Sequence, residues 1–176
     1  MAACSTPNTP LQRYIVRLEK VQGDIAPIVG PYLFGVKPIS QIVAVDGLTE
    51  GSQGTIELRE QGKTFKIPDD VVDIAALKLQ LREDKDAEGR LVRFLFDEWW
   101  VNRKNAVFNV FVDLTDRMWC HLETFAFYGC TFQERSTPSR VLGTPTLGVI
   151  DMTFLPYEVR KLNSLEILAT AGGLAV

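Results

Sequence analysis

Three cysteines and one histidine are the side chains of this sequence best suited to nucleophilic or metal chemistry. The cysteines are Cys4, Cys120 and Cys130, and no two of them have Cys-x-x-Cys spacing. An odd number without that spacing does not predict a metal framework, and in a reducing cytoplasm the default state is three free thiols. His121 directly follows Cys120. Neighbours on a strand point to opposite faces, so we expect no Cys–His dyad from these positions.

Other common catalytic patterns are missing from the sequence. It has a single histidine, no clustered carboxylates, no Gly-x-Ser-x-Gly motif and no phosphate-binding loop. We therefore expect no catalytic residues, no cofactor, no metal ion and a role other than that of an enzyme.

Length and composition indicate one globular domain. Of the 176 residues, 46% are apolar and 23% are charged, which is ordinary for a protein with a single buried core. The net charge of −3 at pH 7 argues against tight binding to nucleic-acid phosphates, which usually requires a basic domain. No segment approaches the roughly 18–20 apolar residues of a membrane span. Residues 1–10 lack the features of a secretory signal, so we expect no membrane anchor and folding in the cytoplasm.

Periodicity and turn signals predict seven or eight strands. Residues 24–38 and 131–145 contain prolines and glycines and are expected to be irregular. Gln61-Gly62 fits a tight hairpin turn, and Pro68 is expected to end the strand that follows it. The expected strands cover residues 11–21, 41–45, 55–60, 63–67, 77–82, 106–114, 118–128 and 147–158.

The segment 77–82 has the clearest alternation in the chain. Leucines occupy every second position, while Lys78, Gln80 and Arg82 occupy the positions between them. Leucine and lysine also favour helices, so a helix is the alternative. The strict period of two favours a strand with one buried face and one wet face.

One amphipathic helix is predicted over residues 86–103. Asp84 or Asp86 can cap its start, and basic residues at its end suit the helix dipole. Its aromatic end is typical of core packing more often than of a binding platform. The apolar stripe recurs at Leu91, Leu95 and Trp99.

Together these elements predict an α+β fold, namely a mainly antiparallel β-sandwich or small barrel with the helix packed on its side. We expect a flexible N-terminal arm at residues 1–10, a β domain at 11–160 and a C-terminal extension at 161–176. A short helix is expected around 162–170. Periodicity and spacing alone name no function.

Four passages carry a resemblance to a known family. They are Lys66-Ile67-Pro68 with the alternating strand after it, the helix end Phe96-Asp97-Glu98-Trp99, the Gly-Cys-x-Phe segment at 129–132, and the strand at 149–158. In their order and spacing, over roughly residues 11–160, the chain resembles the tail tube proteins of contractile-tailed phages. By extension it resembles the tube proteins of type VI secretion.

The resemblance implies a structural virion protein of a phage tail, made in the host cytoplasm. Its copies would form stacked rings, expected to be hexameric, that make the inner tube and conduct the genome. The implied partners are other copies, the tail sheath protein, the baseplate and the tail terminator, with transient and non-specific passage of double-stranded DNA. A net negative wall would avoid holding DNA tightly. The alternatives are a type VI secretion-like tube protein and a single-ring baseplate or tail terminator protein.

The tube interpretation assigns roles to two sets of residues. An arm reaching the next ring is expected in the hairpin region, with an ordinary solvated hairpin as the alternative. The candidate arm residues are Asp46, Glu50, Gln53, Glu57, Arg59 and Lys63. The candidate lumen-facing residues are Lys78, Gln80, Arg82, Asp113 and Asp151.

The tube interpretation also suggests a hypothesis for the cysteines, namely a disulfide between subunits. A virion released into an oxidising medium could link Cys4 of one subunit to Cys120 or Cys130 of another. Free or buried thiols are the alternative.

Overall fold

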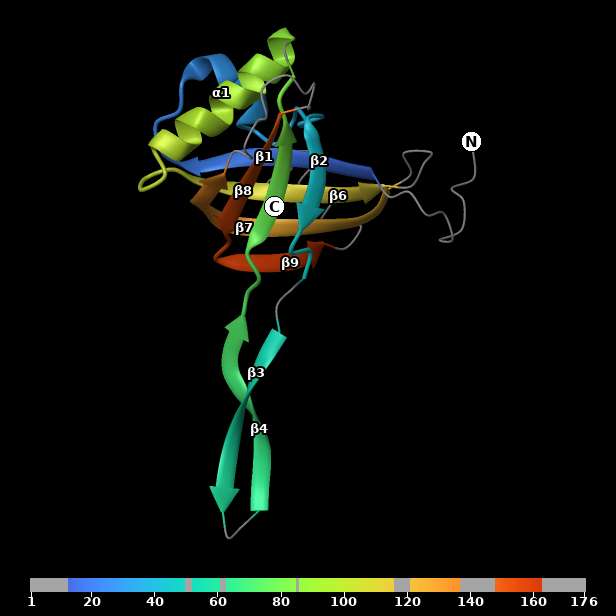
Figure 1. Ribbon diagram of the computed structural model, residues 1–176, viewed down its shortest axis with the longest axis vertical. Helices are drawn as coiled ribbons and strands as arrows, with labels where there is room; N and C mark the ends of the chain where they lie inside the picture. Colours follow the sequence, from blue (N-terminus) through green and yellow to red (C-terminus); the bar gives the residue numbers. More distant parts are fainter. Residues whose placement is uncertain are drawn as a thin grey trace, which may run out of the picture.

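The computed structural model describes residues 13–49, 52–60, 63–84, 86–115, 121–136 and 148–162, with backbone alone at residues 13, 52–60, 63–73, 121 and 122. Figure 1 shows the elements in place. In chain order they are β1 (Arg13–Gln22), the 3-10 helix η1 (Pro27–Tyr32), β2 (Ile42–Asp46), β3 (Ser52–Glu60), β4 (Lys63–Asp73), β5 (Leu77–Arg82), α1 (Ala87–Val101), β6 (Val107–Thr115), β7 (His121–Ser136), β8 (Val149–Leu155) and β9 (Glu158–Leu162).

Seven strands form one antiparallel sheet that folds into two layers. The strand order is β1-β6-β7-β8-β5-β2, and β9 pairs with β7. The first layer comprises β1, β6, the first part of β7 and β9, and the second comprises the end of β7, β8, β5 and β2. In Figure 1 the strands of the first layer run across the view and those of the second cross them steeply. The α+β prediction is confirmed.

Strand β7 joins the two layers at Gly129. Up to Tyr128 the strand pairs with β9, and from Thr131 it pairs with β8. Gly129 has φ +63°, and a Cβ atom there would lie 3.0 Å from Cβ of Tyr157. Both the left-handed backbone and the close approach favour glycine. The bend lets a single strand belong to both layers.

The amphipathic helix α1 lies beside the sheet, as the sequence predicts. The side chain of Asp86 accepts a hydrogen bond from the backbone N–H of Gly89 at 2.7 Å, which caps the first turn. The backbone N–H of Asn102 donates to the Glu98 carbonyl at 3.0 Å and closes the last turn. Among the described residues, no helix is both long and apolar enough to cross a membrane.

An aromatic cluster connects α1 to both layers. The Trp99 side chain is 0% exposed, and its ring centroid lies 4.2 Å from that of Phe108 in β6 and 4.6 Å from that of Phe154 in β8. The ring of Phe132 in β7 is 5.4 Å away. The indole N–H donates to the Ala106 carbonyl at 3.3 Å. One side chain thus contacts three strands, and its polar atom has a partner.

Four sequence expectations differ from the structure. The single strand expected at 147–158 is instead β8 and the start of β9, with a break at residues 156–157. The segment 24–38, expected to be a loop, contains η1, whose first turn tolerates proline because that backbone N–H needs no partner. Pro68 does not end its strand, since β4 continues to Asp73. Pro68 pairs with Thr55 beside a register shift, in a two-stranded ribbon where a missing donor is tolerated. Residues 131–136, expected to be irregular, continue β7 because β8 supplies their backbone partners.

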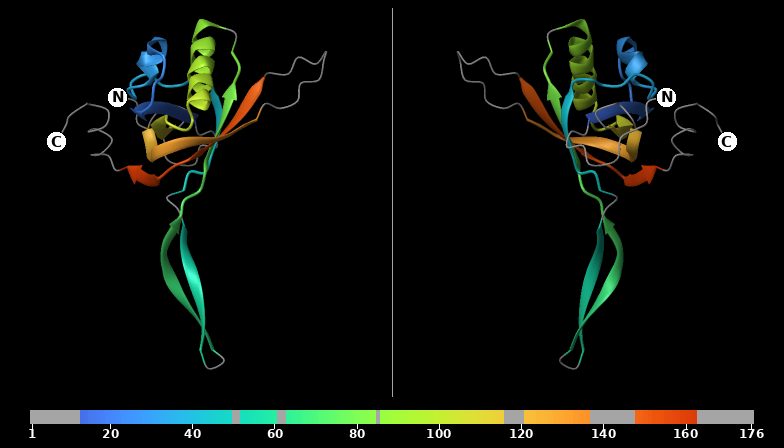
Figure 2. Two further views of the ribbon diagram at one scale, coloured as in Figure 1. Left: turned by 90° about the vertical axis from the view of Figure 1, so that its left-hand side faces the viewer. Right: turned by 90° about the vertical axis from the view of Figure 1, so that its right-hand side faces the viewer.

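Strands β3 and β4 form a separate ribbon. They pair only with each other, from Ser52↔Asp73 to Glu60↔Lys63. The expected tight turn at 61–62 lies outside the described residues. The ribbon extends far from the body of the molecule in all views (Figures 1 and 2).

We predict that Trp99→Ala lowers the free energy of unfolding by about 3–5 kcal/mol, because it empties the space between α1 and both layers. Urea denaturation followed by circular dichroism measures the change. The control is Val101→Ala in the same helix, where the side chain is 71% exposed, and its cost should stay below about 0.5 kcal/mol. Equal costs for the two variants would contradict the central role of Trp99.

Candidate lumen face and assembly surfaces

The second layer has one buried face and one polar face. Leu77, Leu79 and Leu81 of β5 are at most 1% exposed, so the residues between them point away from the core. The register places Asp46, Lys78 and Thr153 side by side, and likewise Ala44, Gln80 and Asp151. Glu134 and Ser136 of β7 continue these two rows. We call this surface the polar sheet face, and its residues are Ala44, Asp46, Lys78, Gln80, Glu134, Ser136, Asp151 and Thr153.

The polar sheet face carries net negative charge. Among its described residues, the carboxylates of Asp46, Glu134 and Asp151 stand against the single ammonium group of Lys78. A recess of about 250 Å³ lies between β2, β5 and β8 and is lined by Asp46, Lys78, Gln80 and Asp151, among others. A larger open recess of about 660 Å³ adjoins it at the base of the ribbon. Such a surface repels polyanions, because its carboxylates outnumber its cationic groups.

Arg82, the last residue of β5, forms hydrogen bonds with a neighbour in the sequence, Asp84. Its guanidinium donates to Asp84 through Nε at 2.7 Å and through Nη2 at 2.8 Å. This hydrogen bonding lowers the pKa of Asp84 below its ordinary value and raises the pKa of Arg82. The positive charge of Arg82 and the negative charge of Asp84 cancel, so this pair adds little net charge to the polar sheet face.

The structure brings together three of the five candidate lumen residues, Lys78, Gln80 and Asp151, and places Asp113 elsewhere. Asp113 lies on the outer side of the first layer and is 8% exposed. It accepts hydrogen bonds from Arg17 Nε at 3.0 Å and from Thr124 Oγ1 at 2.5 Å. Because this carboxylate is buried and paired, its role is to join β1, β6 and β7. The sequence shows the alternation of each strand but not which strands become neighbours.

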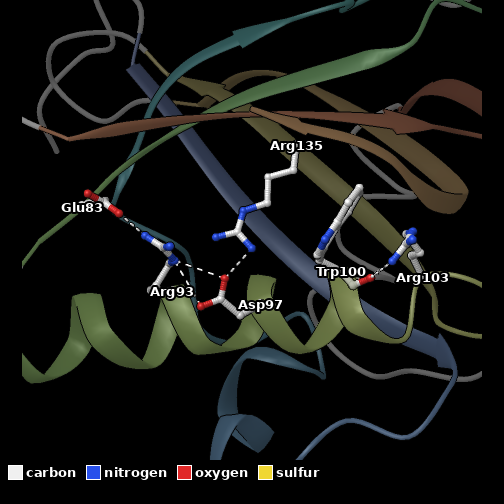
Figure 3. Close-up of polar contacts among 6 residues, drawn as sticks. All are labelled: Glu83, Arg93, Asp97, Trp100, Arg103 and Arg135. Atoms are coloured by element: carbon white, nitrogen blue, oxygen red, sulfur yellow. Dashed lines mark hydrogen bonds and ion pairs between the residues drawn. The ribbon is translucent and has the colours of Figure 1, made fainter. Parts of the chain in front are cut away.

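Ion pairs fasten the outer side of α1 to the sheet, as Figure 3 shows. Arg93 pairs with Glu83 after β5, and its Nε lies 3.2 Å from an Asp97 oxygen. The other Asp97 oxygen lies 2.6 Å from Nη1 of Arg135 at the end of β7. Farther along, Arg103 donates to the Trp100 carbonyl at 3.0 Å. These partly exposed pairs orient the helix more than they stabilise it.

The candidate arm residues fall into two places. Asp46 ends β2 and belongs to the polar sheet face. Gln53, Glu57, Arg59 and Lys63 lie along the ribbon, where only their backbone is described. Glu50 lies outside the described residues. Their role in reaching another ring stays a prediction.

Cys130 is sealed in the core. Its side chain is 0% exposed, and Sγ donates to the Phe127 carbonyl at 3.4 Å. Burial raises the pKa of its thiol to about 12, so the reactive thiolate is scarce at neutral pH. The proposed partners Cys4 and Cys120 lie outside the described residues, and the disulfide hypothesis stays untested. In the folded chain, however, Cys130 is poorly placed to form one.

Two residues of the polar sheet face carry no signal in the sequence. Glu134 and Ser136 join the polar sheet face through β-pairing in a segment whose composition indicates a loop. Thr153 alternates with buried residues of β8, and the period of two in the sequence predicts its outward direction. Within the described ranges, no group of three His, Cys, Asp or Glu residues is placed to hold a metal ion.

Neither a protein-family model nor a curated protein sequence matches this chain, whereas solved structures do. The baseplate of the anti-feeding prophage, 6-fold symmetrised, contains a chain with TM-score 0.64 and 14% identity, covering 90% of this chain and 97% of that one. The sheath-tube complex of the extracellular contractile injection system PVC in its extended state contains one with TM-score 0.62 and 20% identity, covering 90% and 99%. A type six secretion system protein has TM-score 0.52 and 11% identity, covering 84% and 81%. The chain therefore shares its fold, over nearly its whole length, with proteins of contractile injection systems.

We predict that Cys130 resists alkylation in the folded protein. In a Cys4→Ser/Cys120→Ser variant at pH 8.5, iodoacetamide should leave the native chain unmodified while the urea-unfolded chain reacts fully, as measured by mass spectrometry. Since the folded pKa is about 12 and the ordinary value is 9.0, the unfolded state loses its proton first. Stability from the buried neutral thiol is therefore complete below pH 9 and is lost as the pH rises towards 12. Rapid native labelling would show that Cys130 is accessible.

Proposed function

We propose that this chain is a structural, non-catalytic subunit whose copies form stacked rings, expected to be hexameric, that make the inner tube of a contractile, phage-tail-like particle. The observation that carries the proposal is the likeness to a chain of the PVC sheath-tube complex, of which 99% is covered at TM-score 0.62. The likeness covers 90% of this chain as well.

The polar sheet face is the proposed lumen wall. It is a layer of four neighbouring strands whose opposite side is core, so one wet surface spans the whole width of the layer. Its residues Lys78, Gln80 and Asp151 are the sequence candidates that the register brings together. A net negative wall allows double-stranded DNA to slide past because it offers few phosphate contacts.

The setting of the proposed tube is the tail of a virion that ejects its genome. The sheath outside the tube, the baseplate and the terminator at its ends are the partners in that setting. The ribbon β3–β4 is the proposed arm to the next ring.

A single-ring role at the end of a tube is the second candidate. It is favoured by the likeness to a chain of the anti-feeding prophage baseplate, with TM-score 0.64. A terminal ring stacks on one side only, whereas a tube subunit must use both ends. The two candidates therefore differ in whether the purified chain can elongate.

We predict that the purified chain at high concentration forms hollow tubes or stacked rings in negative-stain electron microscopy, because each copy offers complementary ends. Single rings that never stack, even at the highest concentration reached, would favour the terminal role. A uniform monomer, also in the presence of a baseplate, would contradict both candidates.

We further predict that reversing charge on the polar sheet face makes tubes retain DNA. The exposed residues are changed in an Asp46→Lys/Glu134→Lys variant, and tubes are assembled with short duplex DNA. The variant should protect the DNA from nuclease, with protection falling as salt rises, while the parent should not. An outer-surface variant, Glu98→Lys, controls for DNA bound outside, which nuclease removes. Tubes of the Asp46→Lys/Glu134→Lys variant that protect no DNA would argue against this face as the lumen wall.

A further inference from the structure

Strand β6 is buried on both of its faces. Val110 and Val112 belong to the main core. Phe111, Asp113 and Thr115 alternate with them along the strand and point to the opposite side, yet they are at most 8% exposed. On β5, by contrast, the side chains between the buried leucines are exposed or half-buried. A strand that is buried on both faces needs a layer of other residues over each of them.

The neighbouring strands β7 and β9 extend this second buried surface, which we call the outer sheet face. The register places Asp113, Thr124 and Leu162 in one row across β6, β7 and β9, and it pairs Phe111 with Ala126. Among the described residues, Phe111, Ala126 and Leu162 form a buried cluster separate from the main core. Elements η1, β2, β5, α1 and β8 all contribute to the main core, and none of them contributes to this cluster. The described elements that pack on the first layer therefore leave its outer sheet face without a cover.

Leu162 gives the clearest indication that a cover is present. It ends β9, which pairs with β7 and with no other described strand, so one side of Leu162 has no strand beside it. On its other side the same-face neighbours are Thr124 and, diagonally, Ala126, whose short side chains cannot enclose a leucine. Leu162 is nevertheless only 7% exposed. Another segment must lie above it.

The charged groups of the outer sheet face are shielded from water as well. The side chains of Arg17 and Asp113 are only 16% and 11% exposed, whereas Lys78 on the polar sheet face is exposed. Asp113 accepts hydrogen bonds from Arg17 and from Thr124, so the burial of this ion pair is compensated within the face itself. The cover therefore needs no charged group of its own, and an apolar segment fits the site.

The chain that follows Leu162 has the composition and the starting point that this cover requires. It leaves β9 at the outer sheet face itself, because Leu162 is the last residue of the strand and belongs to the cluster. Residues 163–176 contain a single ionisable side chain, that of Glu166. Their large aliphatic side chains are Leu165, Ile167, Leu168, Leu174 and Val176.

Other segments of the chain suit the site less well. Residues 1–12 are mainly small or polar and include two prolines. Residues 116–120 join β6 to β7 next to Thr115, whereas Phe111 lies four residues farther along β6, about 13 Å away at 3.3 Å per residue. Residues 137–147 connect β7 to β8 in the second layer. The segment after Leu162 is thus the best occupant that the chain offers.

We propose that residues 163–176 dock on the outer sheet face of their own copy, with aliphatic side chains over Phe111, Ala126 and Leu162. Adjacent strands lie about 4.8 Å apart, so the face is about 10 Å wide from β9 to β6, and a segment that starts at Leu162 crosses it within a few residues. The docked segment adds a layer to the first sheet layer and removes an apolar patch that would otherwise bind other molecules. The proposal concerns a single copy and does not depend on the proposed tube function.

Thiol labelling tests the docked segment. In the Cys4→Ser/Cys120→Ser background, Ala126→Cys places a thiol beneath the proposed cover, and Cys130 in the main core reports whether the fold is intact. In the folded full-length chain, iodoacetamide at pH 8.5 should modify neither thiol, as measured by mass spectrometry of peptides. When the chain stops at Leu162, position 126 should lose its protection and react as it does in urea, while Cys130 stays unmodified.

A full-length variant repeats the test in case the shortened chain does not fold. Leu165→Asp/Ile167→Asp/Leu168→Asp should also expose position 126, because charged side chains do not pack on the apolar cluster. The matched control, Asn163→Asp/Ser164→Asp/Thr170→Asp, adds the same charge at polar positions and should keep position 126 protected. Protection that persists in the first variant, with Cys130 unmodified, would overturn the proposal.

Two further measurements identify the occupant. Protection of position 126 should be the same at all protein concentrations, and it should survive deletion of residues 1–10. Protection that appears only when copies assemble would assign the cover to a neighbouring copy. Loss of protection in the shortened N-terminal variant would assign it to residues 1–10. Either result would overturn the docking of residues 163–176 and would leave the tube proposal standing.

Discussion

The packing of Trp99 against three strands is the interaction on which the rest of the structure depends. Strand β7 bends at Gly129 and takes part in both layers, so the strands of the two layers cross instead of lying parallel. The Trp99 indole lies between the layers and contacts Phe108, Phe132 and Phe154. Because dense aromatic packing resists rearrangement, the angle between the layers and the place of α1 are set together.

A rigid body of this kind determines which surfaces remain for other molecules. The second layer buries its leucines and leaves the polar sheet face wet, while the ion pairs of Arg93 and Arg135 hold α1 against the opposite side. The first layer pairs its polar residues internally through Asp113. Among the described residues, the large apolar side chains left exposed include Phe34 and Val36 beside β1 and Tyr157 between β8 and β9.

A tube subunit and a terminal-ring subunit of the same fold differ in how many of their ends must bind another ring. Elongation needs an arm at one end and a receiving surface at the other, whereas a terminal ring needs only one of them. Proteins that share this fold include chains of a sheath-tube complex and of a baseplate, so fold alone does not separate the roles.

The sequence by itself determined the local elements. Leu77, Leu79 and Leu81 specify a strand with one buried face because side chains alternate, and Asp86 marks the start of α1 because its carboxylate caps a free N–H. The tertiary structure alone decided the long-range partners. Pairing with β8 made residues 131–136 a strand, the pairing of β1 with β6 brought Arg17 to Asp113, and the core enclosed Cys130. Local periodicity cannot supply these facts, because they depend on which distant backbone groups and side chains meet after folding.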